Sequence, residues 1–246
     1  MISQPTRTLV LLPGMDGSDK LFGPLRAAAP AGVETIAVGY PPGPHNGYDD
    51  LLPIVREQLP TDRPYHLLGW SFSGPLALLA AAERPPGLRG VVLAASFVKT
   101  PVPYLPRWVH RLATPALFRF YPAASRAKAL LGGYGTREVR RLLAEAHAFA
   151  GTEALACRAR AALSIDATAA LAACPVPVLY LRARKDRVIP GSRADEIRRL
   201  FPSLEIADID GPHLALVTNP EAAWDALGAF LARVDHMAAQ PSSTSA

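Results

Sequence analysis

The 246-residue sequence contains only two cysteines, Cys157 and Cys174, and they do not form a CxxC pair. Two separated cysteines cannot build the disulfide framework of a small secreted domain, so we expect reduced thiols. No apolar run approaches the roughly 20 residues that a membrane-spanning helix needs. The first apolar run, Thr8–Leu12, ends at Pro13 and is too short for the core of a secretory signal. The sequence therefore predicts a cytoplasmic protein without a membrane span.

Positive charge is concentrated in one part of the chain. Residues 99–165 contain eleven Lys and Arg against three Glu, a balance of +8, whereas the remainder contains fifteen basic and eighteen acidic residues, a balance of −3. The basic part lacks the interleaved aromatic residues of a nucleic-acid recognition motif, so we expect no nucleic-acid partner. The sequence also contains no HExxH motif and no phosphate-binding P-loop. It therefore predicts neither a metal nor an organic cofactor.

Half of the residues are hydrophobic and 19% are charged, which is typical of a chain that folds around a buried core. Short apolar runs alternate with stretches of helical pattern, as in a parallel sheet covered by helices on both faces. We predict strands at Thr8–Leu12, Glu34–Val38, Tyr65–Gly69, Gly90–Ala94, Val176–Leu181 and Leu204–Asp208. We predict helices at Lys20–Ala29, Asp49–Leu59, Ser73–Arg84, Ser192–Leu200 and Pro220–Val234.

The rhythm changes between residues 99 and 171, where no strand is predicted and prolines are frequent at first. We interpret this stretch as several short helices inserted between two strands of the sheet. The predicted organisation is therefore an α/β core made of residues 1–98 and 172–234, an inserted helical segment at 99–171, and a flexible tail at 235–246.

The most informative motif is Gly69-Trp-Ser-Phe-Ser-Gly74, which lies between a predicted buried strand and a predicted helix. A sharp turn from strand to helix exposes one hydroxyl at the end of the sheet and requires small flanking residues. Ser71 has Gly69 on one side, while Ser73 occupies the position where glycine is usual. Ser73 is a poorer candidate nucleophile because its own flanking residues are Ser71 and Pro75.

This motif resembles the nucleophile elbow, G-x-S-x-G, of the α/β-hydrolase family, and the sequence is most similar to small bacterial serine hydrolases. The resemblance covers residues 8–234. It implies an α/β-hydrolase fold with about six mostly parallel strands and a helical lid formed by residues 99–171. It also implies a catalytic triad in the order Ser71, Asp186, His213. Asp186 follows a predicted strand in Asp-Arg-Val-Ile-Pro190, and His213 follows the next strand in Gly-Pro-His213.

Other residues are open alternatives for the same roles. Asp208, Asp210 or Asp166 can be considered in place of Asp186. The competing histidines are His45, His66, His110, His147 and His236, which we interpret as surface or packing residues. For the oxyanion hole, the resemblance implies the backbone N–H groups of Met15 and Phe72. Met15 lies in Pro13-Gly-Met-Asp-Gly17, immediately after the first predicted strand.

The resemblance implies a serine hydrolase that cleaves a carboxylic ester or a thioester through an acyl-enzyme. A serine at the elbow argues against dehalogenases and epoxide hydrolases, which use an aspartate there. The basic lid disfavours an aminopeptidase, although an aminopeptidase or amidase of the same fold stays an alternative. A non-catalytic binding protein of this fold is another. We expect a small-molecule substrate, and the basic lid favours an anionic acyl carrier as a further partner.

Overall fold

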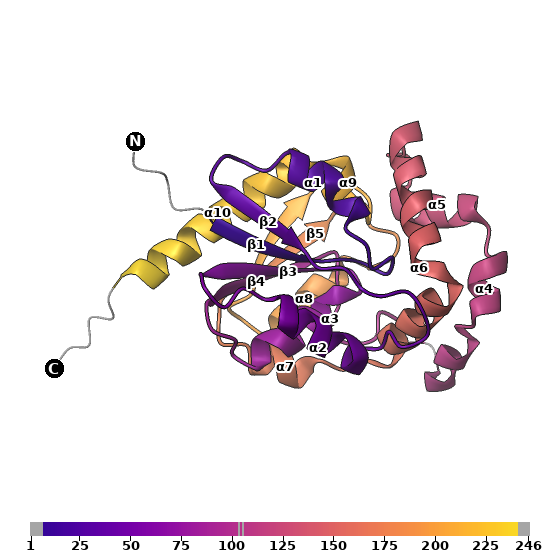
Figure 1. Ribbon diagram of the computed structural model, residues 1–246, viewed down its shortest axis with the longest axis horizontal. Coiled ribbons are helices and arrows are strands. Elements are labelled where there is room, and N and C mark those ends of the chain that lie inside the picture. Colours follow the sequence, from indigo (N-terminus) through magenta and orange to yellow (C-terminus); the bar gives the residue numbers. More distant parts are fainter. Residues whose placement is uncertain (1–6, 103, 105, 241–246) are drawn as a thin grey trace.

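The computed structural model describes residues 7–102, 104 and 106–240. Six strands in this part of the chain form one sheet with the order β2-β1-β3-β4-β5-β6, and every neighbouring pair is parallel. The number and direction of the strands confirm the sequence prediction (Figure 1). The strands are β1 Arg7–Leu12, β2 Val33–Ala37, β3 Tyr65–Trp70, β4 Leu88–Ala94, β5 Val178–Ala183 and β6 Glu205–Ile209.

Helices cover both faces of this sheet, which is why its central strands are apolar along their length. On one face lie α2 Tyr48–Gln58, α3 Ser73–Ala82, α7 Thr168–Ala172 and α8 Ser192–Leu200. On the other lie α1 Gly23–Ala27, α9 Ala215–Thr218 and α10 Pro220–Ala239 (Figure 1). Successive side chains of β1 point to opposite faces of the sheet. Val10 packs on the face covered by α2, α3, α7 and α8, and Leu11 packs on the face covered by α1, α9 and α10.

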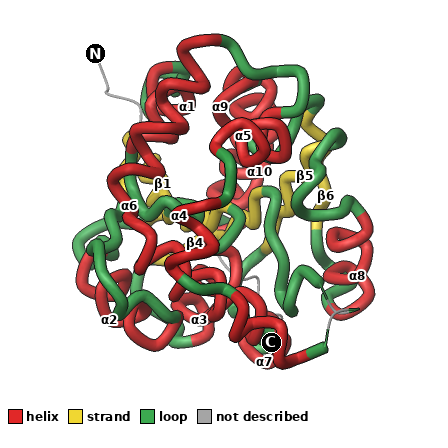
Figure 2. Tube along the Cα trace, turned by 90° about the vertical axis from the view of Figure 1, so that its right-hand side faces the viewer, coloured by secondary structure: helices red, strands yellow, loops and turns green. Residues whose placement is uncertain are grey.

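The inserted segment, residues 99–171, leaves the sheet after β4 and returns before β5. It contains a 3₁₀ helix, Arg107–Leu112, and the helices α4 Pro115–Phe120, α5 Ala123–Leu131 and α6 Arg137–Ser164. These helices lie at the carboxyl ends of the strands, and Figure 2 shows α4 and α5 in front of the sheet when it is viewed from that side. The two ends of the segment meet, because the amide of Thr100 donates to the carbonyl of Ile165 at 3.1 Å.

Helix α6 is interrupted at Gly151, whose φ of 71° and ψ of 162° are not helical. A side chain at this φ would be strained, so glycine is required for the break. The first half of the helix therefore ends at Ala150 and the second half runs from Thr152 in a different direction. Within the described residues, no helix has the length and apolar character needed to cross a membrane.

Several predicted boundaries differ from the structure. The helix expected at Lys20–Ala29 is divided into a 3₁₀ turn, Lys20–Phe22, and α1, because Gly23 and Pro24 start a new helix. Strand β5 begins at Val178 and not at Val176, since Pro177 has no amide hydrogen to donate to the sheet. Helix α7 falls inside the expected inserted segment, but it packs against α3 in the core.

The sequence predicts a flexible tail that begins at Asp235, but residues 235–239 are helical. Helix α10 continues to Ala239, and Asp235 is bound to two residues of the sheet. Its carboxylate accepts hydrogen bonds from Nε of Arg7 at 2.7 Å and from Nε2 of His66 at 2.9 Å. These contacts hold the end of α10 against β1 and β3. Residues 241–246 of the expected tail lie outside the described residues.

His66 should make the stability of the protein depend on pH. Burial lowers the pKa of this histidine below its ordinary value of 6.5, although Asp235 opposes the shift. Below pH 6.5 the unfolded chain then binds a proton before the folded chain does, so the free energy of unfolding falls as the pH falls. We expect His66→Gln to reduce this slope between pH 7 and 5 in urea titrations. An unchanged slope would assign the pH dependence to other groups.

Candidate active site

Ser71 occupies a tight turn between β3 and α3. Its φ is 50°, a left-handed conformation that costs a non-glycine residue about 1–2 kcal/mol. The turn brings the end of β3 against the start of α3, and a side chain on Gly69 would overlap the backbone carbonyl of Ser73. The small residue at position 69 is therefore required by close backbone approach, as the motif predicts.

Hydrogen bonds on both sides of Ser71 hold it in this conformation. Its amide donates to the carbonyl of Ala94 at 2.8 Å, which ties the turn to β4. Its carbonyl accepts the hydroxyl of Ser96 at 2.5 Å, and the amide of Ser96 is itself bound to the Tyr180 hydroxyl at 3.1 Å. These bonds offset the strain of the backbone and fix the direction of the Ser71 side chain.

Ser73, the departure from the usual glycine, is part of the turn's framework. Its hydroxyl donates to the carbonyl of Pro13, and that hydrogen bond uses its only proton. The hydroxyl of Tyr40, 2.6 Å away, must therefore donate to Ser73. Ser73 is fully buried, so it links the turn to the loop after β1 and does not face the site as a second nucleophile.

The structure brings together the three side chains of the predicted triad. Nε2 of His213 lies 2.8 Å from Oγ of Ser71, and Nδ1 lies 2.8 Å from a carboxylate oxygen of Asp186. Because the carboxylate can only accept, Nδ1 carries the proton and Nε2 is free to accept the Ser71 hydroxyl. The three residues come from the loops after β3, β5 and β6, at one edge of the sheet.

Asp186 is held in its orientation by the loop that follows it. One of its carboxylate oxygens accepts the amides of Val188 at 2.7 Å and Ile189 at 2.9 Å, and the other oxygen faces His213. Its side chain is 2% exposed and that of His213 is 4% exposed. The pair is therefore shielded from water, which strengthens the attraction between the carboxylate and a protonated imidazole.

The alternative acids and bases have other partners. Asp208 binds Arg182 at 2.6 Å, Asp210 pairs with Lys185 at 3.1 Å, and Asp166 accepts the hydroxyl of Thr168. The ring of His66 is bound to Asp235, and that of His236 lies 2.9 Å from the Gln240 amide. The structure places neither His45 nor His110 among the residues around Ser71.

The loop after β1 lies beside Ser71. A Cβ built on Gly14 would be 4.0 Å from that of Ser71. The loop closes on itself through a hydrogen bond from the amide of Gly17 to the carbonyl of Gly14, at 3.1 Å. No backbone acceptor is found among the described residues for the amides of Met15 and Phe72, the two that the sequence predicts for an oxyanion hole.

Phe72, the residue after Ser71, is fixed by two tyrosines. Its ring stacks on Tyr48 with 4.7 Å between centroids, and the hydroxyl of Tyr48 donates to its carbonyl at 2.9 Å. Tyr40 meets the same ring edge-on at 6.4 Å. The peptide that carries the Phe72 amide is therefore held from the side of α2, which the motif alone could not reveal.

Arg158 in the second half of α6 contacts the loop beside Ser71, a contact that sequence reasoning missed. It is fully buried, and its guanidinium donates to the carbonyls of Met15 at 2.9 Å and Pro41 at 3.1 Å. It also donates to the side-chain oxygen of Asn46 at 3.0 Å. An arginine in an alanine-rich helix gives no sequence signal of this role, because its partners lie more than 110 residues away.

A pocket of about 50 Å³ opens above Ser71 and His213. Asp16 and His147 also line it, and neither was assigned to the site from the sequence. Burial raises the pKa of Asp16, although the hydroxyl and amide of Ser18 oppose the shift. Burial lowers the pKa of His147, whose Nδ1 lies 2.9 Å from the carbonyl of Leu143. Because the carbonyl can only accept, Nδ1 donates to it, and in the neutral imidazole that burial favours Nε2 is an acceptor.

No group of three or more His, Cys, Asp or Glu side chains is placed to hold a metal ion in the part of the chain described here. The two cysteines are free thiols. The chemical groups around Ser71 are thus a hydroxyl, an imidazole paired with a carboxylate, and backbone amides. Such a set can carry out nucleophilic acyl transfer.

The comparison with protein families agrees with this geometry. A model described as the alpha/beta hydrolase family matches residues 9–226. The chain therefore belongs to the α/β-hydrolase family, and the six-stranded parallel sheet flanked by helices is the fold of that family.

Individual relatives are distant. A curated relative, pyrrolizixenacetamide deacetylase from Xenorhabdus hominickii, is 25% identical over 179 residues, which cover 70% of this chain and 67% of the relative. Among solved structures, an esterase from Exiguobacterium antarcticum has a TM-score of 0.78 at 15% identity, covering 93% of this chain and 92% of that one. A bromoperoxidase from Bacillus anthracis has a TM-score of 0.78 at 18% identity, covering 92% of each chain. At these identities the structural likeness shows the fold alone.

Proposed function

We propose that the protein is a serine hydrolase that cleaves a carboxylic ester or a thioester through an acyl-enzyme. The observation that carries this proposal is the unbroken chain of hydrogen bonds from Ser71 through His213 to Asp186, with both distances at 2.8 Å. A serine hydroxyl is a weak nucleophile unless a base removes its proton, and this arrangement supplies the base and orients it.

In the first half of the reaction, Oγ of Ser71 attacks the acyl carbon while Nε2 of His213 accepts the hydroxyl proton. Asp186 stabilises the imidazolium and keeps the imidazole in the tautomer that can accept. The amides of Met15 and Phe72 donate to the oxyanion of the tetrahedral intermediate, and one such donor is typically worth about 3–4 kcal/mol. His213 then protonates the leaving alcohol or thiol as its bond to the acyl carbon breaks.

In the second half, His213 removes a proton from water, and the resulting hydroxide attacks the acyl carbon of the ester on Ser71. The second tetrahedral intermediate collapses to release the carboxylic acid, while His213 returns its proton to Ser71. Every proton that moves is carried by His213, so these steps need neither a metal nor an organic cofactor. Water reaches the site through the pocket above Ser71.

The inserted segment serves as a lid over this site. Leu130 of α5 and Leu143 and His147 of α6 line the pocket above Ser71, which supports this role. The positive balance of the segment favours an anionic substrate, such as a thioester on an acyl carrier. We place the reaction in the cytoplasm. The substrate itself is a small molecule or the acyl end of such a carrier.

Hydrolysis of an amide by the same residues is a second candidate, because the Xenorhabdus relative is named a deacetylase of an acetamide. A protein of this fold without catalysis is the remaining alternative. A fluorophosphonate probe separates catalysis at Ser71 from a protein that only binds its ligand. We expect it to label the protein at Ser71, with labelling abolished by Ser71→Ala and retained by Ser73→Ala.

Absence of labelling in folded protein would contradict the proposal and favour a binding protein. If the probe labels Ser71, a panel of p-nitrophenyl esters, acyl-coenzyme A thioesters and aryl acetamides then assigns the reaction. We expect kcat/KM to be larger for the esters and thioesters than for the amides. A preference for the amides would favour the second candidate.

A further inference from the structure

A groove of about 800 Å³ lies in the inserted segment between α4, α5 and α6. Leu143 and His147 line both this groove and the pocket above Ser71, so the two spaces are neighbours that share part of one wall. A volume in this range suits a small organic ligand. The groove can therefore hold the part of a substrate that extends away from the bond cleaved at Ser71.

Three cations, Arg126, Lys128 and Arg140, line this groove, and no Asp or Glu lines it. None of the three forms an ion pair within the described residues, although most arginines of the core do. Unpaired cations gathered around one concave space raise the local concentration of anions there. The rest of the wall is largely apolar and includes Phe118 and Leu155.

Arg126 is the best positioned of these cations. One nitrogen of its guanidinium donates to the carbonyls of Tyr121 at 2.7 Å and Phe118 at 3.3 Å. Its remaining nitrogens have no acceptor in the described part of the chain. The positive charge of Arg126 also reaches His147, where it adds to burial in lowering the pKa of the imidazole. Arg126 therefore keeps part of its guanidinium available to an anion in the groove.

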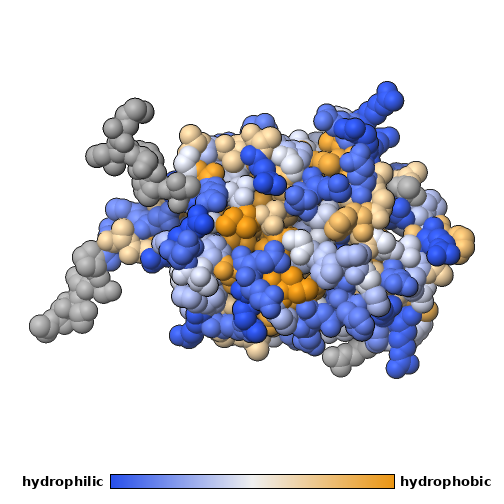
Figure 3. Space-filling model, viewed as in Figure 1, coloured by the Kyte–Doolittle hydropathy of each residue, from blue (hydrophilic) through white to orange (hydrophobic). Residues whose placement is uncertain are grey.

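Arg140 lies on the first turn of α6, where its Nε would be 3.0 Å from a Cβ on Gly135. The glycine leaves room for the arginine side chain to lie over the loop between α5 and α6. Figure 3 shows strongly hydrophilic residues at the tips of the inserted segment with apolar residues between them. The groove therefore combines an apolar wall with a cationic border.

From these observations we infer that the groove is a second subsite, which binds a carboxylate or phosphate at the far end of an ester or thioester substrate. This inference rests on the proposed function of Ser71. The substrate class is an acyl compound with an apolar middle part that contacts the groove wall and an anionic end that meets Arg126, Lys128 and Arg140. A neutral compound of the same length lacks the last of these interactions.

The test compares esters of equal length that differ only in terminal charge. The substrates are mono-p-nitrophenyl esters of glutaric to suberic acid, neutral p-nitrophenyl esters of pentanoic to octanoic acid, and a matched series that ends in phosphate. The variant Lys128→Glu/Arg140→Glu changes two exposed side chains and should fold normally. We expect it to lower kcat/KM for one or both anionic series about tenfold relative to the neutral series. The two anionic series distinguish carboxylate from phosphate.

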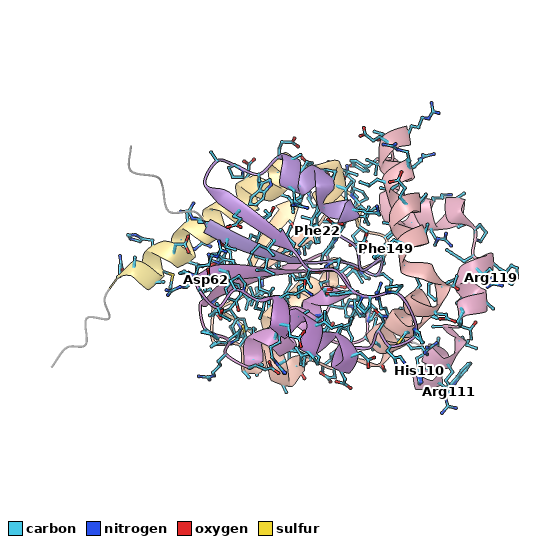
Figure 4. The ribbon with its side chains drawn as sticks, in the orientation of Figure 1. Phe22, Asp62, His110, Arg111, Arg119 and Phe149 are labelled. Carbon is cyan, nitrogen blue, oxygen red and sulfur yellow. The ribbon has the colours of Figure 1, made fainter. Side chains whose placement is uncertain are left out.

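The control variant is Arg111→Glu/Arg119→Glu. Both arginines belong to the inserted segment but do not line the groove, and they point away from the molecule at its outer edge (Figure 4). We expect this control to leave the preference for an anionic end nearly unchanged. Arg126→Met, which keeps the apolar stem without charge, should weaken the preference in the same direction as the groove variant.

An unchanged preference in the groove variant, or an equal loss in the control, would overturn the inference. The inference is also overturned if the groove variant lowers kcat/KM only for a thioester on an acyl carrier protein and for none of the small anionic esters. Hydrolysis of the neutral esters is measured in parallel, because it requires the proposed catalytic residues around Ser71 but not the cations of the groove. Loss of that reaction in the unmodified protein indicates failure of the proposed function, whereas loss of the charge preference alone indicates failure of the groove inference.

Discussion

Replacement of Asp186 by asparagine should lower kcat about 10⁴-fold while the protein stays folded. The carboxamide oxygen can still accept the amides of Val188 and Ile189, so the loop after β5 keeps its shape. The carboxamide nitrogen, however, then faces Nδ1 of His213, and two donors cannot share that contact. The imidazole takes the other tautomer, with its proton on Nε2, and can no longer accept the proton of Ser71.

The matched controls are Asp208→Asn and Asp210→Asn. Asp208 forms an ion pair with Arg182, and Asp210 forms one with Lys185. We expect either control to change kcat less than threefold, because neither acid contacts His213. The loss of stability should also be small, since an exposed ion pair contributes about 0–1 kcal/mol. Steady-state kinetics on one p-nitrophenyl ester, together with thermal unfolding, provide the measurement. A large loss in Asp210→Asn combined with a small one in Asp186→Asn would reverse the assignment of the acid.

Replacement of Arg158 by methionine should impair both stability and catalysis. The change leaves the carbonyls of Met15 and Pro41 and the oxygen of Asn46 without their buried donor, at about 1–3 kcal/mol each. Removal of a desolvated charge offsets part of this cost, so we expect a net loss of roughly 3 kcal/mol in the free energy of unfolding. The loop that carries the Met15 amide then loses its contact with α6.

Because that amide is proposed to stabilise the oxyanion, kcat should fall by about 10–100-fold with little change in KM, less than for loss of a whole donor. The affinity for a trifluoromethyl ketone, whose adduct carries the same oxyanion, should fall in parallel. The control is Arg160→Met, two residues along α6, whose guanidinium donates to the carbonyl of Ala113. If Arg158→Met unfolds more easily but keeps kcat and ketone affinity, Arg158 is a structural residue without influence on the oxyanion hole.

The sequence predicted those features that depend on local pattern. All six strands were placed within a few residues. Most of them are short apolar runs, as expected for strands buried on both faces, whereas β2 and β6 at the edges of the sheet are only partly buried. Ser71 was predicted by its motif, whose requirement for Gly69 reflects contact between neighbouring backbones. The errors at Pro177 and at Gly23-Pro24 arose where a single residue ends or restarts an element against the trend of its neighbours.

Features that depend on distant contacts could not be predicted. Ser73 was identified as a departure from the motif, but its partners Pro13 and Tyr40 are known only from the fold. The contacts of Arg158 with the loop after β1, and the position of His147 beside Ser71, depend on how α6 crosses the sheet edge. The end of α10 was predicted too early because the partners of Asp235 lie about 170 and 230 residues away in the chain.

The break in α6 at Gly151 separates the cation that α6 contributes to the groove from the arginine that anchors the loop beside Ser71. Arg140, Leu143 and His147, which border the groove, belong to the first piece of α6. Arg158, which anchors the loop beside Ser71, belongs to the second piece, which also contributes Leu155 to the groove wall. Substitutions in the first piece can therefore retune substrate preference while leaving the anchor undisturbed. Directed evolution of substrate preference in this protein should therefore concentrate its libraries on the first piece.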